Sequence, residues 1–315
     1  MRDAADHEAG GMISISHLRK TYGDKVAVDD VSLEVAEGEV LGVLGPNGAG
    51  KTTTVECLAG LRVPDSGAVR VAGLDPLTDR DELTRLLGVQ LQESRLQPKV
   101  TVDEALRLWS ALYDDPLPWR DLIGRLGLEE QLRTRFRDLS GGQQQRLSIA
   151  LALVGRPRVV ILDELSTGLD PRARRDVWEI VRDLRRDGVT VLLVTHSMEE
   201  AQQLCDRIAI IDGGRIRALD TPDALIAGAT AATVTSFSTD DPVDLESLRE
   251  LASVSAVRAE SDRIVVEGRD GAALEVLERL GRQQVTPHGL RVVDGTLDQA
   301  YLQLTDKQTT EEMHA

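Results

Sequence analysis

The sequence predicts an α/β fold with a parallel sheet, followed by a smaller α+β module. Two short runs of β-branched and other apolar residues, Val159–Leu162 and Val189–Val194, are each followed by a helical pattern. Such runs are typical of buried parallel strands. A third apolar run, Val40–Leu44, leads through a glycine-rich segment into another helix. Residues 226–232 then read as a linker, so we expect a second module after them.

The first domain is predicted to span residues 12–225, after a polar tail at residues 1–11. Its early strands are expected at residues 13–15, 31–35 and 40–44, the second with alternating apolar and polar residues. A helix is expected over residues 51–61, directly after the glycine-rich segment. Strands and helices that alternate in this way indicate an α/β sheet.

A helical insertion is predicted at about residues 96–157, where the pattern becomes amphipathic. Thr101 and Glu104 have the spacing of a capping box at the start of its first helix. Trp109 and Tyr113 lie four residues apart, so we expect them on one face of that helix. That face belongs either to the core or to a groove for a partner.

The second module is predicted at residues 233–305, with a polar tail at 306–315. Its order of elements, β-α-β-β-α-β with a final helix, is compatible with a ferredoxin-like module. The expected elements are strand 233–237, helix 244–251, strands 254–259 and 263–267, helix 271–280, strand 285–293 and helix 296–304.

Composition limits the classes of function. The 315 residues carry 53 acidic and 37 basic side chains, a formal net charge of −16, which argues against a nucleic-acid partner. The apolar runs are too short for a membrane-spanning helix, and the first residues lack the order of a signal peptide. Cys57 and Cys205 are predicted to be buried thiols in a reducing, cytoplasmic compartment.

The glycine-rich segment Gly45–Thr52 has the pattern G-x-x-x-x-G-K-[ST]. Glycines let backbone N–H groups converge on phosphate oxygens, and the following helix points its positive end at the same anion. Lys51 supplies a full charge to the phosphates, and Thr52 offers a hydroxyl to Mg²⁺. The segment therefore predicts a nucleotide phosphate site, although many unrelated NTPases share it.

Two further motifs narrow this prediction. Asp163 and Glu164 follow a buried strand, and adjacent carboxylates there repel each other unless a cation or water network occupies the site. Leu139–Gln143, of sequence Leu-Ser-Gly-Gly-Gln, precedes a helix. Ser140 is a natural N-cap, and the two glycines leave the free N–H groups of the helix exposed. This is a second anion-facing helix start, with no lysine of its own.

The three motifs together resemble the ATP-binding subunit of an ABC transporter, over about residues 12–225. Within that family the chain is most similar to the ATPases of drug-resistance type exporters. The resemblance implies a P-loop NTPase fold of ABC type, which hydrolyses ATP with Mg²⁺. The residues that it implies for ATP binding are Tyr22 against the adenine and Gly45, Pro46, Asn47, Gly48, Ala49, Gly50, Lys51, Thr52 and Thr53 around the phosphates.

The resemblance also implies roles for residues outside the phosphate loop. Glu164 matches the general base, and His196 matches the switch histidine that senses the γ-phosphate or is simply a strand-end histidine. Tyr22 is alternatively a core tyrosine. The metal residues are Thr52, Asp163 and Gln92 of the glutamine loop, with Gln90 as the rival to Gln92.

In this family the signature of one subunit covers the ATP held by the other, so a homodimer or pseudo-symmetric dimer is implied. The signature residues are Leu139, Ser140, Gly141, Gly142 and Gln143. Asp170 matches the loop that crosses this dimer interface, or it serves only as an N-cap before Pro171.

The implied function is to drive export of a drug, antibiotic or lipid-like substrate through separate integral membrane permease subunits, from the cytoplasmic face of the membrane. The region after Gln92 is the expected docking surface for those subunits. The alternative is a soluble ABC-type ATPase of translation or DNA repair. Such chains usually carry two cassettes, zinc-binding cysteines or long coiled coils, and this sequence has none of these.

Two local expectations concern the ends of buried strands. The family usually has proline after the catalytic glutamate, whereas Leu165 follows Glu164 here. Because a proline would hold Glu164 in the extended region, we expect the glutamate to be freer and its turnover to change. Ser197 and Glu200 have the spacing of another capping box.

Overall fold

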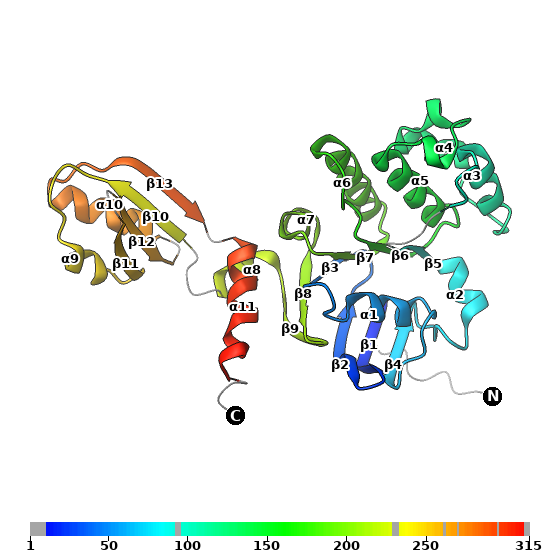
Figure 1. The fold of residues 1–315 in the computed structure, drawn as a ribbon, viewed down its shortest axis with the longest axis horizontal. Coiled ribbons are helices and arrows are strands. Elements are labelled where there is room, and N and C mark those ends of the chain that lie inside the picture. Colours follow the sequence, from blue (N-terminus) through cyan, green and yellow to red (C-terminus); the bar gives the residue numbers. More distant parts are fainter. Residues whose placement is uncertain are drawn as a thin grey trace. The chain divides into compact units, whose positions relative to one another are not determined.

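The structure is a computed structural model that describes residues 11–91, 96–228, 233–260, 263–269, 271–294 and 296–311. The chain divides into two compact units, Met1–Leu219 and Asp220–Ala315. Figure 1 labels their helices and strands.

The first unit contains a six-stranded sheet of order β5-β6-β7-β3-β8-β9. The first five of these strands pair in parallel, and the turn Gly213-Gly214, with positive φ at both residues, joins β8 to β9. The strands are β3 (Val40–Leu44), β5 (Leu87–Gln90), β6 (Val159–Asp163), β7 (Thr190–Thr195), β8 (Arg207–Asp212) and β9 (Arg215–Asp220). Strands β3, β6 and β7 are buried along their whole length.

A second sheet of the first unit is antiparallel, with the order β2-β1-β4. Its strands are β1 (Ile13–Tyr22), β2 (Lys25–Val35) and β4 (Ser66–Val71). Helix α1 (Lys51–Leu58) lies next to both sheets (Figure 1). One buried apolar cluster joins Leu18 and Val28 of this sheet to Val55 of α1 and to Ile161 and Val194 of the parallel strands. The core therefore fixes the start of α1 against the carboxyl ends of the parallel strands.

The other helices of this unit lie before, within and after the predicted insertion at residues 96–157. They are α2 (Arg80–Leu86), α3 (Val102–Ser110), α4 (Trp119–Leu126), α5 (Gly141–Leu153), α6 (Pro171–Arg186) and α7 (Met198–Leu204), with short 3₁₀ turns at Glu129–Gln131 and Phe136–Asp138. The predicted capping box of Thr101 and Glu104 is confirmed. Helix α3 ends at Ser110, so the prediction that Trp109 and Tyr113 share a helix face was wrong. Tyr113 lies beyond the helix, with its ring against Gly155.

The second unit contains a four-stranded antiparallel sheet of order β11-β12-β10-β13. This is the order of the predicted ferredoxin-like module. Its elements are β10 (Thr233–Ser238), α9 (Leu245–Arg249), β11 (Val254–Glu260), β12 (Arg263–Gly268), α10 (Ala272–Arg282), β13 (His288–Asp294) and α11 (Leu297–Glu311). Its own core contains Phe237, Leu248, Val266, Val276 and Leu280. Helix α8 (Pro222–Gly228) packs against α11, so it belongs with this unit although the predicted boundary placed part of it in the first domain.

The predicted fold class is therefore confirmed: an α/β core with a helical insertion, followed by a small α+β module. Both cysteines are buried free thiols, as predicted. Among the residues that the structure describes, no helix has the length and apolar character required to cross a membrane.

Candidate nucleotide site

The loop between β3 and α1 can be built only with glycine at two positions. Gly50 has φ +105°, and a Cβ there would lie 2.3 Å from the carbonyl oxygen of Ala27. A Cβ on Gly45 would lie 2.2 Å from the carbonyl oxygen of Ile211. Neighbouring backbone thus packs directly against the loop on two sides. The close packing leaves room only for glycine here, and the loop leads directly into the N-terminus of α1, which is the geometry that an anion needs.

Lys51, the first residue of α1, has a buried side chain that is already in place. Its Nζ donates to the carbonyl oxygens of Gly45 at 2.8 Å and Pro46 at 3.0 Å. Burial lowers the pKa of Lys51, while Glu164 and Asp163 act in the opposite direction. A phosphate in the loop would bring negative charge to this partly desolvated ammonium group, and would therefore favour its charged form.

The acidic pair lies at the carboxyl end of β6, across from Lys51. Asp163 is only 2% exposed. Glu164 has an unusual positive φ of 51°, and its N–H donates to the carbonyl oxygen of Val194 at 2.8 Å. Its side chain is 9% exposed and accepts a hydrogen bond from Thr167 at 3.4 Å.

This geometry bears on the expectation for the missing proline. Glu164 is in the left-handed region and not in the extended region, and Leu165 is fully buried. A buried leucine side chain anchors the chain immediately after the glutamate, and the backbone bond to Val194 fixes it on β7. The backbone of Glu164 therefore adopts a conformation that a following proline would disfavour, while the expected effect of Leu165 on turnover stays a prediction.

His196 follows β7 and lies beside the glutamate. Its Nδ1 is 3.3 Å from Oε1 of Glu164, while half of the histidine side chain is exposed. The structure thus brings Glu164 and His196 together from two neighbouring strand ends. A histidine with one edge on the carboxylate and the rest open to solvent can contact a ligand that enters the site.

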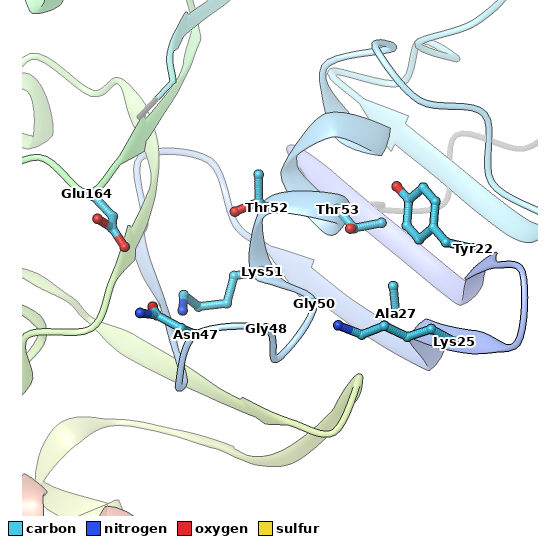
Figure 2. Close-up of a pocket in the computed structure, with 10 residues that line it drawn as sticks. All are labelled: Tyr22, Lys25, Ala27, Asn47, Gly48, Gly50, Lys51, Thr52, Thr53 and Glu164. Carbon is cyan, nitrogen blue, oxygen red and sulfur yellow. The ribbon is translucent and has the colours of Figure 1, made fainter. Parts of the chain in front are cut away.

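A pocket extends from Glu164 to Tyr22, the residue predicted for the adenine end of the site. Figure 2 shows Glu164 on one side of Lys51 and Tyr22 on the other side of the start of α1. The pocket is lined by Tyr22, Lys25, Ala27, Asn47, Gly48, Gly50, Lys51, Thr52, Thr53 and Glu164. Tyr22 is 40% exposed at the end of β1, so the alternative of a core tyrosine was wrong.

Three residues near this pocket were not identified from the sequence. Lys25 and Ala27 line it, and the Arg62 guanidinium lies 5.3 Å from the centre of the Tyr22 ring. Ala27 matters through its backbone, which packs against Gly50. No sequence motif marks any of these three residues. Only the short spacing between Tyr22 and Lys25, across a tight turn between two strands, could have indicated that Lys25 lies near the pocket.

Oxygen ligands suited to Mg²⁺ are present, although no metal is part of the structure. The Thr52 hydroxyl and the buried Asp163 carboxylate are the hard donors that this ion prefers. No cluster of three or more histidine, cysteine or acidic side chains arranged to hold a metal occurs among the residues that the structure describes. Gln92 lies outside the described residues, while its rival Gln90 is buried at the end of β5.

The second anion-facing motif lies outside this pocket. Ser140 caps α5 in a complete capping box: its hydroxyl accepts from the Gln143 N–H at 3.3 Å, and Gln143 accepts from the Ser140 N–H at 2.9 Å. Gly141 is exposed, and Gly142 packs against Ala173 of α6. None of the residues Leu139, Ser140, Gly141, Gly142 or Gln143 lines the pocket that contains Lys51.

Asp170 caps α6 and precedes Pro171, as one of its two interpretations predicted. The Asp170 carboxylate accepts from the N–H groups of Arg172 at 2.9 Å and Ala173 at 3.1 Å. These bonds lower the pKa of Asp170. Its side chain is exposed, so the capping role leaves it accessible to a partner subunit.

Comparison with known proteins places this geometry in a family. Residues 28–167 match the family model described as ABC transporter. The Nod factor export ATP-binding protein I of Ralstonia nicotianae is 36% identical over 307 residues, which cover 94% of each chain. The protein of the same name from Paraburkholderia xenovorans is 42% identical over 239 residues, covering 74% of this chain and 78% of the relative.

Solved structures agree with these relatives. An ATP-binding subunit of an ABC transporter matches with a TM-score of 0.63 and 28% identity, over 68% of this chain and 91% of the other. A dimeric ATP-binding cassette in a post-hydrolysis state, bound to ADP and phosphate, matches with a TM-score of 0.60 and 27% identity, over 67% of this chain and 98% of the other. The chain therefore belongs to the family of ABC transporter ATP-binding subunits, and it is an ATPase.

Proposed function

We propose that this subunit hydrolyses ATP at two composite sites in a head-to-tail homodimer, and so drives export through separate membrane subunits. The observation that carries this proposal is the separation of two anion-facing helix starts in one chain. Lys51 and Glu164 share a pocket, whereas the Ser140 helix start does not line that pocket and has no basic residue in its first turn. Related cassettes form dimers, which supports closure of each site by a second subunit.

Within each site, residues of the first motif hold the nucleotide. Tyr22 stacks on the adenine, the backbone from Gly45 to Gly50 surrounds the phosphates, and Lys51 and Thr52 contact the β- and γ-phosphates and the metal. Mg²⁺ would be held by Thr52 and Asp163, with Gln92 as the further ligand that we infer from the family. When bound, this ion neutralises charge on the phosphates.

The reaction is assigned to the residues at the ends of β6 and β7. Glu164 accepts a proton from the attacking water or orients it, which is the task of a general base. His196, 3.3 Å from Glu164, is placed to contact the γ-phosphate and to report its loss. The partner's signature supplies helix N–H groups to the same γ-phosphate. Asp170 stands at the start of α6 and contacts the partner across the two-fold axis.

The helical insertion is proposed as the docking surface for the membrane subunit. A pocket between β5, α3 and α5 is lined by apolar and aromatic residues that include Leu96, Trp109, Tyr113 and Leu151. Gln90 also lines it; this side chain is 4% exposed, and its Oε1 has no hydrogen-bond partner within the described part of the chain. An inserted segment that brings an N–H donor would satisfy this oxygen.

The direction of transport is inferred from the relatives, which are named for the export of Nod factor. We place the subunit on the cytoplasmic face of the membrane, because ATP and the membrane subunits must both be within reach. A drug, antibiotic or lipid-like compound remains the proposed class of substrate. The predicted domain of residues 12–225, shortened to end at Leu219 where the first unit ends, is proposed for ATP hydrolysis, and residues 233–305 are proposed for an accessory role in dimerisation or docking. The names of the relatives give no support to a soluble ATPase of translation or repair.

The docking proposal is tested with Trp109→Glu in the full chain, co-expressed with its membrane subunit. We expect the variant to hydrolyse ATP normally as an isolated protein but to be lost from the purified membrane complex, because a charge would enter the apolar pocket. Leu274→Glu, on an exposed site of α10 in the other unit, is the matched control. Normal recovery of the Trp109 variant in a complex that still transports would refute this docking site.

A further inference from the structure

Several helix starts in the described part of the chain have the sequence of a capping box. The boxes at Thr101, Ser140 and Thr296 close, whereas the one at Ser197 does not. At Thr101 and Ser140, the side chain three residues later returns to the N–H of the capping residue. At Ser197, the hydroxyl accepts from the Glu200 N–H at 3.3 Å, but the Ser197 N–H donates to the hydroxyl of Thr195 at 3.0 Å. The prediction of a full capping box at Ser197 was therefore wrong. The Glu200 carboxylate is used elsewhere.

Glu200 instead forms a buried hydrogen bond with a tryptophan of another helix. Its Oε1 accepts from Nε1 of Trp178 on α6 at 3.0 Å, and the two residues are 1% and 6% exposed. Its Oε2 is also buried, with no hydrogen-bond partner within the described part of the chain. A buried carboxylate with one neutral donor is costly. A closed capping box in solvent would have avoided that cost, so stability does not explain this arrangement.

The position of the bond indicates a role in the site. Helix α6 begins at Pro171, six residues after the end of the Asp163-Glu164-Leu165 segment. Helix α7 begins directly after His196 and Ser197. The Trp178–Glu200 bond therefore joins the two helices that follow the acidic pair and the histidine. The buried 3.0 Å bond holds α7 to α6, and the segments that lead into these two helices carry the 3.3 Å contact between His196 and Glu164.

We propose that Trp178 and Glu200 are positioning residues, which set His196 against Glu164 and couple α6 to the histidine when ATP closes the dimer. This inference rests on the proposed roles of Glu164 and His196. Neither Trp178 nor Glu200 lines the nucleotide pocket. Breaking their bond should therefore slow turnover and leave nucleotide affinity unchanged.

The test is steady-state ATP hydrolysis by the full chain with three changes. Trp178→Phe keeps an aromatic ring but removes the N–H, so we expect kcat to fall about tenfold with an unchanged KM, because small misplacements of catalytic groups have effects of this order or larger. Glu200→Gln keeps an acceptor oxygen for Trp178, so kcat should remain within about twofold of the wild type. Trp178→Phe combined with Glu200→Met replaces both polar partners by apolar groups. It should regain thermal stability but not kcat.

Glu39→Met is the control for a purely structural effect. Glu39 is another buried glutamate, bonded to Ala36 and Arg207, but it lies just before β3 at the amino ends of the parallel strands, away from the site. It should lower thermal stability and leave kcat unchanged. The proposal is overturned if Trp178→Phe and the double variant keep normal kcat, or if Glu200→Gln loses as much kcat as Trp178→Phe. Glu164→Gln is measured alongside, because normal turnover by that variant would refute the proposed function itself and not only this coupling.

Discussion

The starts of α1 and α5 both present glycines and free N–H groups, but they differ in what surrounds those groups. At α1, Lys51 is buried and bonded to the loop, and Glu164 stands opposite. At α5, Ser140 and Gln143 occupy each other in a neutral capping box, and no acidic or basic side chain lies in the first turn. The first start can hold a phosphate by charge. The second has no charge of its own to hold a phosphate and offers N–H groups only, which supports the proposal that it contacts a nucleotide held by a partner subunit.

The largest effect is expected at Glu164, which lies opposite the start of α1. Glu164→Gln keeps the shape of the pocket but removes the general base, so kcat should fall by about 10²–10⁴-fold. ATP binding should persist, and an ATP-bound dimer should accumulate. Phosphate release and size-exclusion chromatography with ATP measure both outcomes, and wild-type phosphate release by the variant would remove Glu164 from this role.

The next largest effect is expected at Lys51, whose positive charge has no counterpart at the start of α5. Lys51→Ala removes the only lysine bonded within the loop, so ATP affinity should weaken by roughly 10- to 100-fold, the effect of losing a charged hydrogen bond. Equilibrium binding of a fluorescent ATP analogue measures this change. Lys25→Ala, at the rim of the same pocket, serves as the comparison and should have the smaller effect. Equal affinities for the wild type and the Lys51 variant would contradict the assignment.

Glycine substitutions compare the backbones of the two helix starts. Gly50→Ala places a Cβ 2.3 Å from Ala27 at φ +105°, whereas a Cβ on Gly141 meets only Leu169 at 3.9 Å. We expect Gly50→Ala to lower the free energy of unfolding by about 1–3 kcal/mol, and Gly141→Ala to leave it nearly unchanged. Thermal and urea unfolding of the two purified variants decide this. Equal free energies of unfolding for the two variants would contradict the claim that backbone packs more tightly around Gly50 than around Gly141.

The smallest effect is expected at Asp170, which caps α6. Its hydrogen bonds lower its pKa in the folded state. Stability from this carboxylate is therefore present above its unfolded pKa and is lost as the pH falls through the lowered folded pKa. Asp170→Asn keeps a capping acceptor but cannot titrate, so the difference in melting temperature between wild type and variant should shrink in acid. A difference that is constant between about pH 7 and pH 3 would contradict this origin.

The site around Lys51 was largely predictable because its physics is local. Chain connectivity alone places Lys51 and Thr52, because they follow a strand and a glycine loop at the start of a helix. The position of Asp163 could be predicted because it ends a buried apolar strand. The capping roles of Ser140 and Asp170 were likewise readable, since each depends on residues within three positions. In the second module the order of strands and helices along the chain was also predicted, because each element has its own local pattern.

What the sequence did not reveal depends on contacts between distant segments. The left-handed backbone of Glu164 arises from its bond to Val194 on β7. The bond of Glu200 to Trp178 replaces a local capping box with a contact between two residues 22 positions apart, on different helices. Lys25 and Ala27 reach the pocket because β1 and β2 pair against the loop. No residue pattern within one element reports such contacts.

The central claim is that the α5 start of one subunit completes the α1 site of another. It is tested most directly with Ser140→Arg, whose long side chain would occupy the place of the partner's γ-phosphate, mixed with Lys51→Ala. Each variant alone should fail to retain ATP in a dimer, while the mixture should retain one ATP per dimer, because one composite site then has both an intact Lys51 and an intact Ser140. If Ser140→Arg alone retained and hydrolysed ATP like the wild type, the signature would not act in trans and the account would be wrong.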